Sequence, residues 1–311
     1  MPIAITRPGK FTLELETPVM PAAGTFGFGD VYRDLVNIEK IGAVVTNPLT
    51  YDGWSPASGT RVVPMEGGVL VHTGLPNPGL NRALKRYRGQ WALLPVPVIV
   101  HLVATGIDHV RKCASRLDEE DSVDAIELGL GDDITWEEVE ELVDAAVSRC
   151  DKPVLVRLPF QESVDVAEAA ADAGAAALVL SAPPRGTARD PRTGRLVSGR
   201  IYGPLVKPVI LRLVGQLARR LDEVPVIAAG GVHTPDDARD YMEAGARAVQ
   251  VDSVIWVQPN MLEVIGRDLG GWIVTREADG SPDDWHPGMG DTEREKRRRS
   301  QRPAAEEDHT S

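Results

Sequence analysis

Eight short apolar segments follow one another along the chain, and stretches with the periodicity of amphipathic helices separate most of them. The segments are 18–24, 42–46, 96–103, 123–129, 152–158, 176–181, 224–230 and 248–253. Helical spacing of apolar residues is clear at 135–150, 162–174 and 234–246. Strands that are apolar without alternation are buried on both faces, which is typical of parallel sheets covered by helices. Eight such units predict an α/β fold, a (β/α)8 TIM barrel.

The two ends of the chain depart from this pattern. Residues 5–18, ITRPGKFTLELETP, alternate between apolar and polar, which predicts an N-terminal β-hairpin that plugs the bottom of the barrel. Beyond about residue 275 the sequence is polar and mixed in charge, and flanking acids offset its basic run at 294–302. We therefore expect a barrel domain over residues 1–275 and a disordered C-terminal tail over 276–311.

Composition excludes several classes of function. The formal net charge of −12 argues against nucleic acid as a partner, because phosphate binding needs basic residues concentrated on one face. The two cysteines, Cys113 and Cys150, both lie in helical patterns, so we expect neither a disulfide framework nor a metal site. The N-terminus has no apolar signal-like segment, and no stretch reaches transmembrane length. These features predict a cytoplasmic protein with no membrane partner.

The ligand of such a barrel is expected at the C-terminal ends of the strands, with phosphate after strands seven and eight. Those junctions read AAGGV at 228–232 and VQVDSV at 249–254. Paired glycines allow backbone N–H groups to approach an anion closely, and the helix beginning near Thr234 adds its positive end. A glycine pair after a strand is also typical of a tight turn, so both interpretations stay open.

Several motifs in order give the chain a family resemblance. They are PVMPAAGTFGFGD (18–30), EGGVLVHTGLPNPGL (66–80), VDAIELG (123–129), GTARDPRTGRLVSGRIYGPLVKP (186–208) and VIAAGGVHTPDDARDYMEAGARAVQV (226–251). Over nearly all of residues 10–268 the sequence resembles the dihydroorotate dehydrogenase family, the soluble bacterial kind in particular. The resemblance implies a flavoprotein of pyrimidine metabolism, an oxidoreductase that binds FMN at the top of the barrel and oxidises dihydroorotate to orotate. It also implies a small-molecule substrate and a homodimer.

The family's flavin contacts carry over where residues match. The first-strand segment lies along the isoalloxazine ring, the turn in IYGP helps to cradle the phosphate, and the glycine pair after strand seven binds it. The implied cofactor-binding residues are Ala22, Ala23, Gly24, Gly203, Gly230 and Gly231. The alternative is that these small residues only permit close packing at the barrel mouth.

The resemblance breaks at the residues that carry the family's chemistry. Its fourth strand ends in E-L-N-x-S-C-P-N, whose cysteine is the base, whereas residues 127–134 read ELGLGDDI. Other departures are Asn47 for the lysine of T-K-S, Arg157 for the flavin-contacting lysine, Val71 and Ala182 for substrate asparagines, and Asp252-Ser253 for Gly-Thr. No catalytic residue can therefore be assigned from the motif.

Each departure has a chemical consequence. A site without amides discriminates poorly for a planar, uracil-like carboxylate, so dihydroorotate is not the expected substrate. Asp132 aligns with the missing base, but Asp132, Asp133 and Thr135 also suit a helix cap, which is the favoured interpretation. A carboxylate at Asp252 about 4 Å from a phosphate would cost roughly 4 kcal/mol per charge pair.

Alternation along the strands predicts which polar side chains enter the barrel. In 248–253 it turns Ala248, Gln250 and Asp252 inward, and it does the same for Glu127, Arg157 and His101. An unpaired buried charge is too costly to keep, so these residues should pair with one another or with a bound anion.

Three functional hypotheses follow. The first is a dihydroorotate dehydrogenase-like FMN-binding oxidoreductase with altered or lost substrate specificity. The alternative is a catalytically inactive binding or regulatory subunit without flavin, its mouth closed by a network of Arg157, Glu127 and Asp252. The third is a non-flavin barrel enzyme that uses His101, His72 or Asp132.

Overall fold

A computed structural model describes residues 2–160 and 164–277 and shows the expected barrel. Parallel strands form one sheet in the order β3-β14-β13-β10-β9-β8-β7-β4. Their bounds are β3 (Val19–Pro21), β4 (Val44–Val45), β7 (Val98–Val103), β8 (Ala125–Gly129), β9 (Val154–Arg157), β10 (Ala177–Leu180), β13 (Val226–Ala229) and β14 (Ala248–Val251). The sheet closes between β3 and β4, where the Gly42 N–H donates to the Val19 carbonyl at 2.7 Å. The predicted (β/α)8 fold is confirmed.

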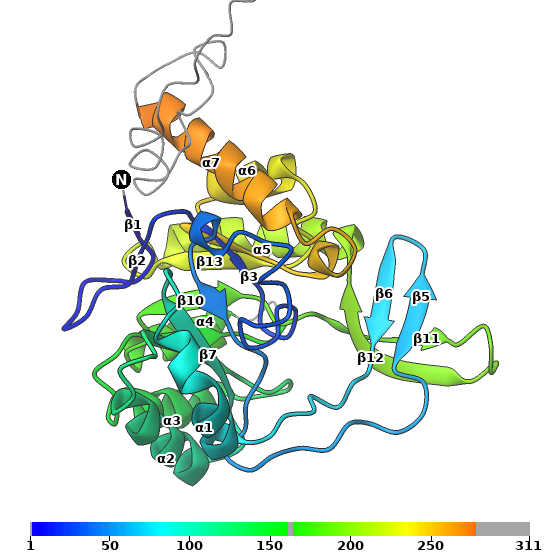
Figure 1. Ribbon diagram of the computed structural model, residues 1–311, viewed down its shortest axis with the longest axis horizontal. Coiled ribbons are helices and arrows are strands. Elements are labelled where there is room, and N and C mark those ends of the chain that lie inside the picture. Colours follow the sequence, from blue (N-terminus) through cyan, green and yellow to red (C-terminus); the bar gives the residue numbers. More distant parts are fainter. Residues whose placement is uncertain (1, 161–163, 278–311) are drawn as a thin grey trace, which may run out of the picture.

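Helices cover the outside of this sheet (Figure 1). They are α1 (Leu80–Trp91), α2 (Ile107–Asp118), α3 (Trp136–Val147), α4 (Val164–Asp172), α5 (Lys207–Arg220), α6 (Pro235–Glu243) and α7 (Met261–Glu277), with short 3-10 turns η1 (Ile38–Lys40), η2 (Pro204–Val206) and η3 (Ser253–Trp256). The helices predicted at 135–150, 162–174 and 234–246 are α3, α4 and α6. Both α3 and α6 begin with a capping box, in which a threonine and an acid three residues later satisfy free backbone N–H groups.

The core has two layers because strand side chains alternate between the helices and the barrel interior. Val249 and Val251 pack in the outer layer, whereas Ala248 packs in the inner one, as the alternation predicts. The N-terminal hairpin, β1 (Ile3–Ala4) with β2 (Glu14–Leu15), contributes Leu15 to the inner layer. The Arg7 N–H donates to the carbonyl of residue 176, just before β10. The hairpin therefore plugs the N-terminal end of the barrel, as predicted.

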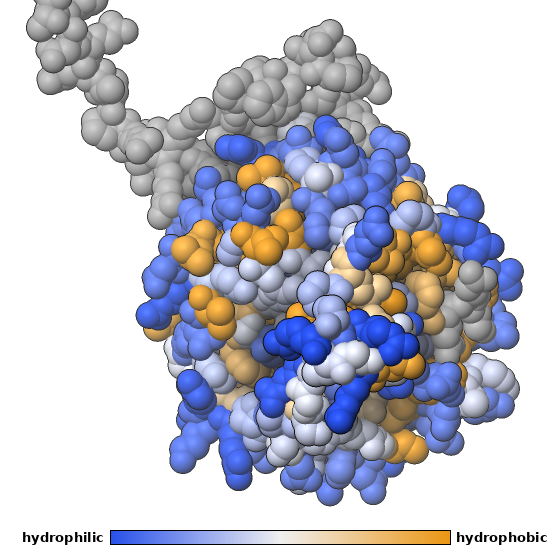
Figure 2. All heavy atoms as spheres, turned by 90° about the vertical axis from the view of Figure 1, so that its right-hand side faces the viewer, coloured by the Kyte–Doolittle hydropathy of each residue, from blue (hydrophilic) through white to orange (hydrophobic). Residues whose placement is uncertain are grey.

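A second sheet stands beside the barrel, and the sequence patterns did not predict it. It is antiparallel, in the order β11-β12-β6-β5, with β5 (Val62–Met65), β6 (Gly68–Val71), β11 (Arg185–Arg189) and β12 (Leu196–Tyr202). It projects at the right of Figure 1. Figure 2 faces this side, where strongly hydrophilic side chains gather near the centre. Most residues of these strands are half-buried or exposed, and only Val63 and Leu70 are buried, so the strands lack the continuous apolar run that predicts a barrel strand.

The chain ends bear on two further predictions. The boundary expected at residue 275 falls inside α7, which continues to Glu277. The remainder of the predicted tail, 278–311, lies outside the described residues. Within the described parts of the chain, no helix combines the length and the apolar character needed to cross a membrane.

Candidate functional site

The predicted cofactor-binding residues come together at the C-terminal end of the barrel. Ala22 directly follows β3, and its N–H donates to the carbonyl of Val251 in β14 at 2.7 Å. Gly230 directly follows β13, and its Cα faces Val206 of η2. The turn that starts at Gly203 therefore packs onto the glycine pair. This is the end at which barrel enzymes bind ligands.

Packing alone requires glycine at positions 230 and 231. Gly230 has φ +133°, and a Cβ there would lie 2.3 Å from the Ile210 side chain. Gly231 has φ +69°, and a Cβ there would lie 2.9 Å from the backbone nitrogen of Lys207. The close approach of η2 and α5 to the end of β13 thus accounts for both glycines, and their ligand contacts stay a prediction.

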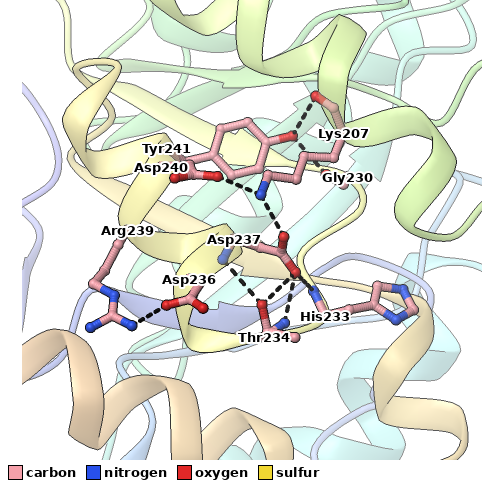
Figure 3. Close-up of polar contacts among 9 residues, drawn as sticks. All are labelled: Lys207, Gly230, His233, Thr234, Asp236, Asp237, Arg239, Asp240 and Tyr241. Atoms are coloured by element: carbon pink, nitrogen blue, oxygen red, sulfur yellow. Dashed lines mark hydrogen bonds and ion pairs between the residues drawn. The ribbon is translucent and has the colours of Figure 1, made fainter.

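Lys207, the first residue of α5, joins this turn to α6 (Figure 3). Its Nζ contacts Asp237 Oδ1 at 2.5 Å and Asp240 Oδ2 at 2.6 Å. Burial alone would lower the pKa of Lys207, but the hydrogen bonds that it donates to the two carboxylates raise it above its ordinary value. Tyr241 donates its hydroxyl to the Gly230 carbonyl at 2.8 Å. The glycine turn is therefore held by α5 on one side and by α6 on the other.

The first turn of α6 uses its own carboxylate. Asp237 Oδ2 accepts the backbone N–H of His233 at 3.0 Å and that of Thr234 at 2.8 Å. Thr234 is the N-cap, which confirms the helix start expected there. An acid in the first turn stabilises the positive end of a helix. These two N–H groups are consequently engaged within the helix start itself.

Asp252, at the end of β14, engages the backbone N–H groups beside the glycine pair. Its Oδ2 accepts the Gly231 N–H at 3.3 Å, and its Oδ1 accepts the Ser253 N–H at 2.5 Å. The side chain is 3% exposed. Burial raises the pKa of Asp252, and the hydrogen bonds from Ser253 offset part of that rise. A carboxylate of the chain therefore lies where the resemblance implies a phosphate.

A second buried network crosses the barrel interior. Glu127 Oε1 contacts His101 Nδ1 at 2.7 Å and Arg157 Nη1 at 3.1 Å. Arg157 Nη1 also donates to Gln250 Oε1 at 2.5 Å, and Gln250 Nε2 donates to Glu127 Oε2. Burial by itself raises the pKa of Glu127, but the Arg157 charge and the hydrogen bonds from His101 and Gln250 lower it to about 2. Glu127 is therefore an ionised partner of Arg157.

These contacts test the prediction that the polar side chains inside the barrel pair with one another. Pairing of Glu127, Arg157 and His101 with one another is confirmed. The predicted closing network is wrong in one member, because Asp252 binds Gly231 and Ser253 instead of Arg157. Gln250 takes that place. Alternation had already turned Gln250 inward, but only the spatial neighbours reveal its two partners.

Gly129 aligns with the first asparagine of the family's E-L-N-x-S-C-P-N motif, and another side chain fills the space beside it. A Cβ at Gly129 would lie 2.6 Å from His101 Nε2. The imidazole is held in place by Glu127 and is 6% exposed. A side chain at position 129 would have to displace it. The His101 ring of the neighbouring strand β7 therefore occupies the space that the side chain of the family's asparagine would need.

The loop after β8 holds Asp132 in an ion pair. Arg200 of β12 donates Nη1 to Asp132 Oδ1 at 2.7 Å and Nη2 to Oδ2 at 2.8 Å, and Arg185 Nε lies 2.6 Å from Oδ2. The prediction that Asp132 caps α3 is wrong. Thr135 is the N-cap, as expected, and Asp133 has a left-handed backbone with φ +56°. Asp132 instead ties the loop to the four-stranded sheet, through a partner that local sequence does not reveal.

Remaining candidates are separated in space. His72 is exposed at the end of β6 in the second sheet, away from the interior network that holds His101. Val71 pairs with Arg200 across β6 and β12. Asn47, which follows β4, has a buried Oδ1 without a hydrogen-bond partner. Among the residues described, no group of three His, Cys, Asp or Glu side chains is arranged to hold a metal ion.

Sequence comparisons agree with this architecture. The family model described as dihydroorotate dehydrogenase matches residues 10–272. The chain belongs to the dihydroorotate dehydrogenase family. Two relatives are the dihydroorotate dehydrogenase B (NAD(+)) catalytic subunits of Pelobacter propionicus and Geobacter sulfurreducens. They are 33% and 34% identical to this chain, and each alignment covers 84% of it and 91% or 90% of the relative.

Family membership makes the protein a dihydroorotate dehydrogenase-like oxidoreductase. In a barrel of the dihydroorotate dehydrogenase family, the C-terminal face described above is the candidate active site. Its polar contacts include the interior network around Glu127, the Asp132 ion pair, the Asp252 contacts beside the glycine pair, and the contacts of Lys207 with Asp237 and Asp240.

Proposed function

We propose that this protein is a dihydroorotate dehydrogenase-like oxidoreductase that acts on a small molecule other than dihydroorotate. The observation that carries the proposal is the state of Asp132, the residue aligned with the family's base. Both of its carboxylate oxygens accept hydrogen bonds from Arg200, and a second guanidinium, Arg185, contacts one of them. A carboxylate whose two oxygens are both held by guanidinium groups is fixed against the second sheet and is poorly oriented to reach a proton on a substrate.

Loss of the base lowers the reaction rate by a factor whose order of magnitude is known. A positioned general base contributes roughly 10²–10⁴ to the rate of a step that removes a carbon-bound proton. Dihydroorotate oxidation, as implied by the resemblance, contains such a step. The favoured substrate is therefore one whose reaction does not depend on proton abstraction by the loop after β8.

The substrate-binding side of the site supports the same conclusion. Position 129 cannot present an amide, because the His101 ring occupies the space that a side chain there would need. Val71 stands at a second position where the resemblance implies an asparagine. A pyrimidine ring whose donors and acceptors find no hydrogen-bond partners in a site binds weakly, because each buried polar group left unsatisfied costs about 1–3 kcal/mol.

FMN, the cofactor that the resemblance implies, fits one part of the site and conflicts with another. Next to β3, Ala23 is half-buried and Gly24 exposed, so a flat ring has access to them. The buried, unpartnered Oδ1 of Asn47 would be satisfied by a ligand N–H. The phosphate end does not fit, because Asp252 already accepts the Gly231 and Ser253 N–H groups. The residues thus suit a flavin ring better than a flavin phosphate.

The test uses the full-length protein, with and without added flavin. We expect no orotate formation from dihydroorotate with an artificial electron acceptor. We also expect Asp132→Asn and its neighbour Asp133→Asn to behave alike in that assay. Dihydroorotate turnover that Asp132→Asn abolishes and Asp133→Asn preserves would show that Asp132 is a working base and would refute the proposal.

A second candidate is a catalytically inactive binding or regulatory barrel. The closed interior network favours it, since Glu127, Arg157 and Gln250 satisfy one another without any ligand. The absorbance spectrum separates the two candidates. Flavin bands in the purified or reconstituted protein, together with bleaching by a chemical reductant and recovery in air, would support the oxidoreductase. Protein that takes up no flavin in any form would support the inactive barrel.

A further inference from the structure

We propose that the Asp252 carboxylate occupies the anion cradle, the position formed by the Gly231 and Ser253 backbone N–H groups at the C-terminal end of the barrel. The site therefore selects a flavin that ends in a hydroxyl group over one that ends in a phosphate. This inference rests on the proposed function and names its ligand class. It starts from the two backbone N–H groups, of Gly231 and Ser253, that converge on one carboxylate.

The geometry is that of an anion site already filled from within. Gly231 has φ +69°, a conformation that turns its N–H toward the end of the neighbouring strand β14. Asp252 is only 3% exposed and uses both carboxylate oxygens, one for each N–H group. An external anion would have to remove a buried carboxylate from both donors before it could bind them.

The arginines near this site already have carboxylate partners, since Arg157 pairs with Glu127 and Arg200 with Asp132. Lys207, the cation next to the cradle, is engaged by Asp237 and Asp240. Burial raises the pKa of Tyr202 and of Tyr241, and the nearby charge of Asp252 raises both further. A phosphate would therefore add negative charge to a site that already has it. At about 4 Å and an effective dielectric near 20, one such charge pair weakens binding about a thousandfold.

The same carboxylate suits a hydroxyl ligand. Asp252 Oδ2 accepts the Gly231 N–H with one lone pair and has a second, so a ligand O–H can bind it without displacing a backbone N–H group. Ser253 Oγ donates to Asp252 Oδ1 at 3.0 Å and lies 3.0 Å from His233 Nε2, which continues the polar contacts toward the surface. Riboflavin carries the same ring as FMN and ends in a hydroxyl group, so it is the matched probe.

The experiment titrates the full-length protein with riboflavin and with FMN and follows the quenching of flavin fluorescence. We expect the wild type to bind riboflavin at least about a hundredfold more tightly than FMN. Asp252→Asn keeps the size of the side chain and removes its charge, and we expect it to raise FMN affinity by about 10²–10³ while changing riboflavin affinity less than tenfold. Asp236→Asn, an 80% exposed acid on the first turn of α6, is the control and should change neither affinity.

Three results would overturn the inference: FMN bound as tightly as riboflavin by the wild type, an affinity ratio that Asp252→Asn leaves unchanged, or no binding of either flavin. Asp252→Gly provides a second variant in case the asparagine form fails to fold. Different results would refute the proposed function. Riboflavin selectivity combined with dihydroorotate turnover would refute the proposed function alone, and FMN preference without dihydroorotate turnover would refute the inference alone.

Discussion

Arg157→Met is expected to destabilise the protein by about 3–5 kcal/mol at pH 7, because it leaves a buried carboxylate without its cation. The arginine donates to Glu127 at 3.1 Å, to Gln250 at 2.5 Å and to the Ser181 carbonyl at 3.1 Å. Glu127 is fully buried, so without the guanidinium it takes up a proton. Holding an acid of ordinary pKa 4.5 neutral at pH 7 spans roughly 2.5 pH units, or about 3 kcal/mol.

The sign of the pH dependence makes this prediction specific. In the wild type the pKa of Glu127 is lowered to about 2, so its contribution is present above its ordinary pKa of 4.5 and is lost as the pH falls toward 2. In Arg157→Met the folded-state pKa is raised, so stability recovers as the pH falls from 7. The difference between variant and wild type should shrink by about 2 kcal/mol between pH 7 and about pH 5.5.

Urea unfolding followed by far-ultraviolet circular dichroism at the two pH values measures this difference. Arg220→Met is the matched control, because Arg220 pairs with Glu168 at 2.5 Å but its side chain is 60% exposed. The control should leave both the stability and its pH dependence unchanged within error. A deficit for Arg157→Met that is the same at both pH values would refute the idea that an unpaired Glu127 causes it.

Three further predictions concern the frame of the site. Gly231→Ala should cost about 1–3 kcal/mol, since it forces φ +69° on a residue whose Cβ would lie 2.9 Å from a backbone nitrogen; Gly59→Ala, with φ +79° and open space, should cost less in the same urea assay. Tyr241→Phe removes a buried hydrogen bond to the Gly230 carbonyl, and a loss of about 1–2 kcal/mol in thermal unfolding is expected. Thr135→Ala removes the cap of α3 and should lower stability by about 1 kcal/mol, whereas an unchanged melting temperature would contradict the capping role.

Local sequence determined the barrel, the start of α3 at Thr135, and the inward direction of Glu127 and Arg157. Each depends on a signal within a few residues: strand length and apolar character, a cap followed by an acid, or the two-residue alternation of a strand. The second sheet escaped prediction for the same reason. Its strands are mostly half-buried or exposed, and the pairing that joins its two hairpins, Arg200 of β12 with Val71 of β6, links residues more than a hundred positions apart.

Tertiary structure alone decided what the polar side chains at the mouth contact. Asp132 satisfies a local capping pattern, yet its partner is Arg200, 68 positions away. Asp252 faces inward by alternation, but it binds Gly231, because parallel pairing places the ends of β13 and β14 side by side. Alternation fixes the face on which a side chain lies, whereas the order and register of neighbouring strands decide which groups meet there. The order and register of the strands depend in turn on the closed barrel as a whole.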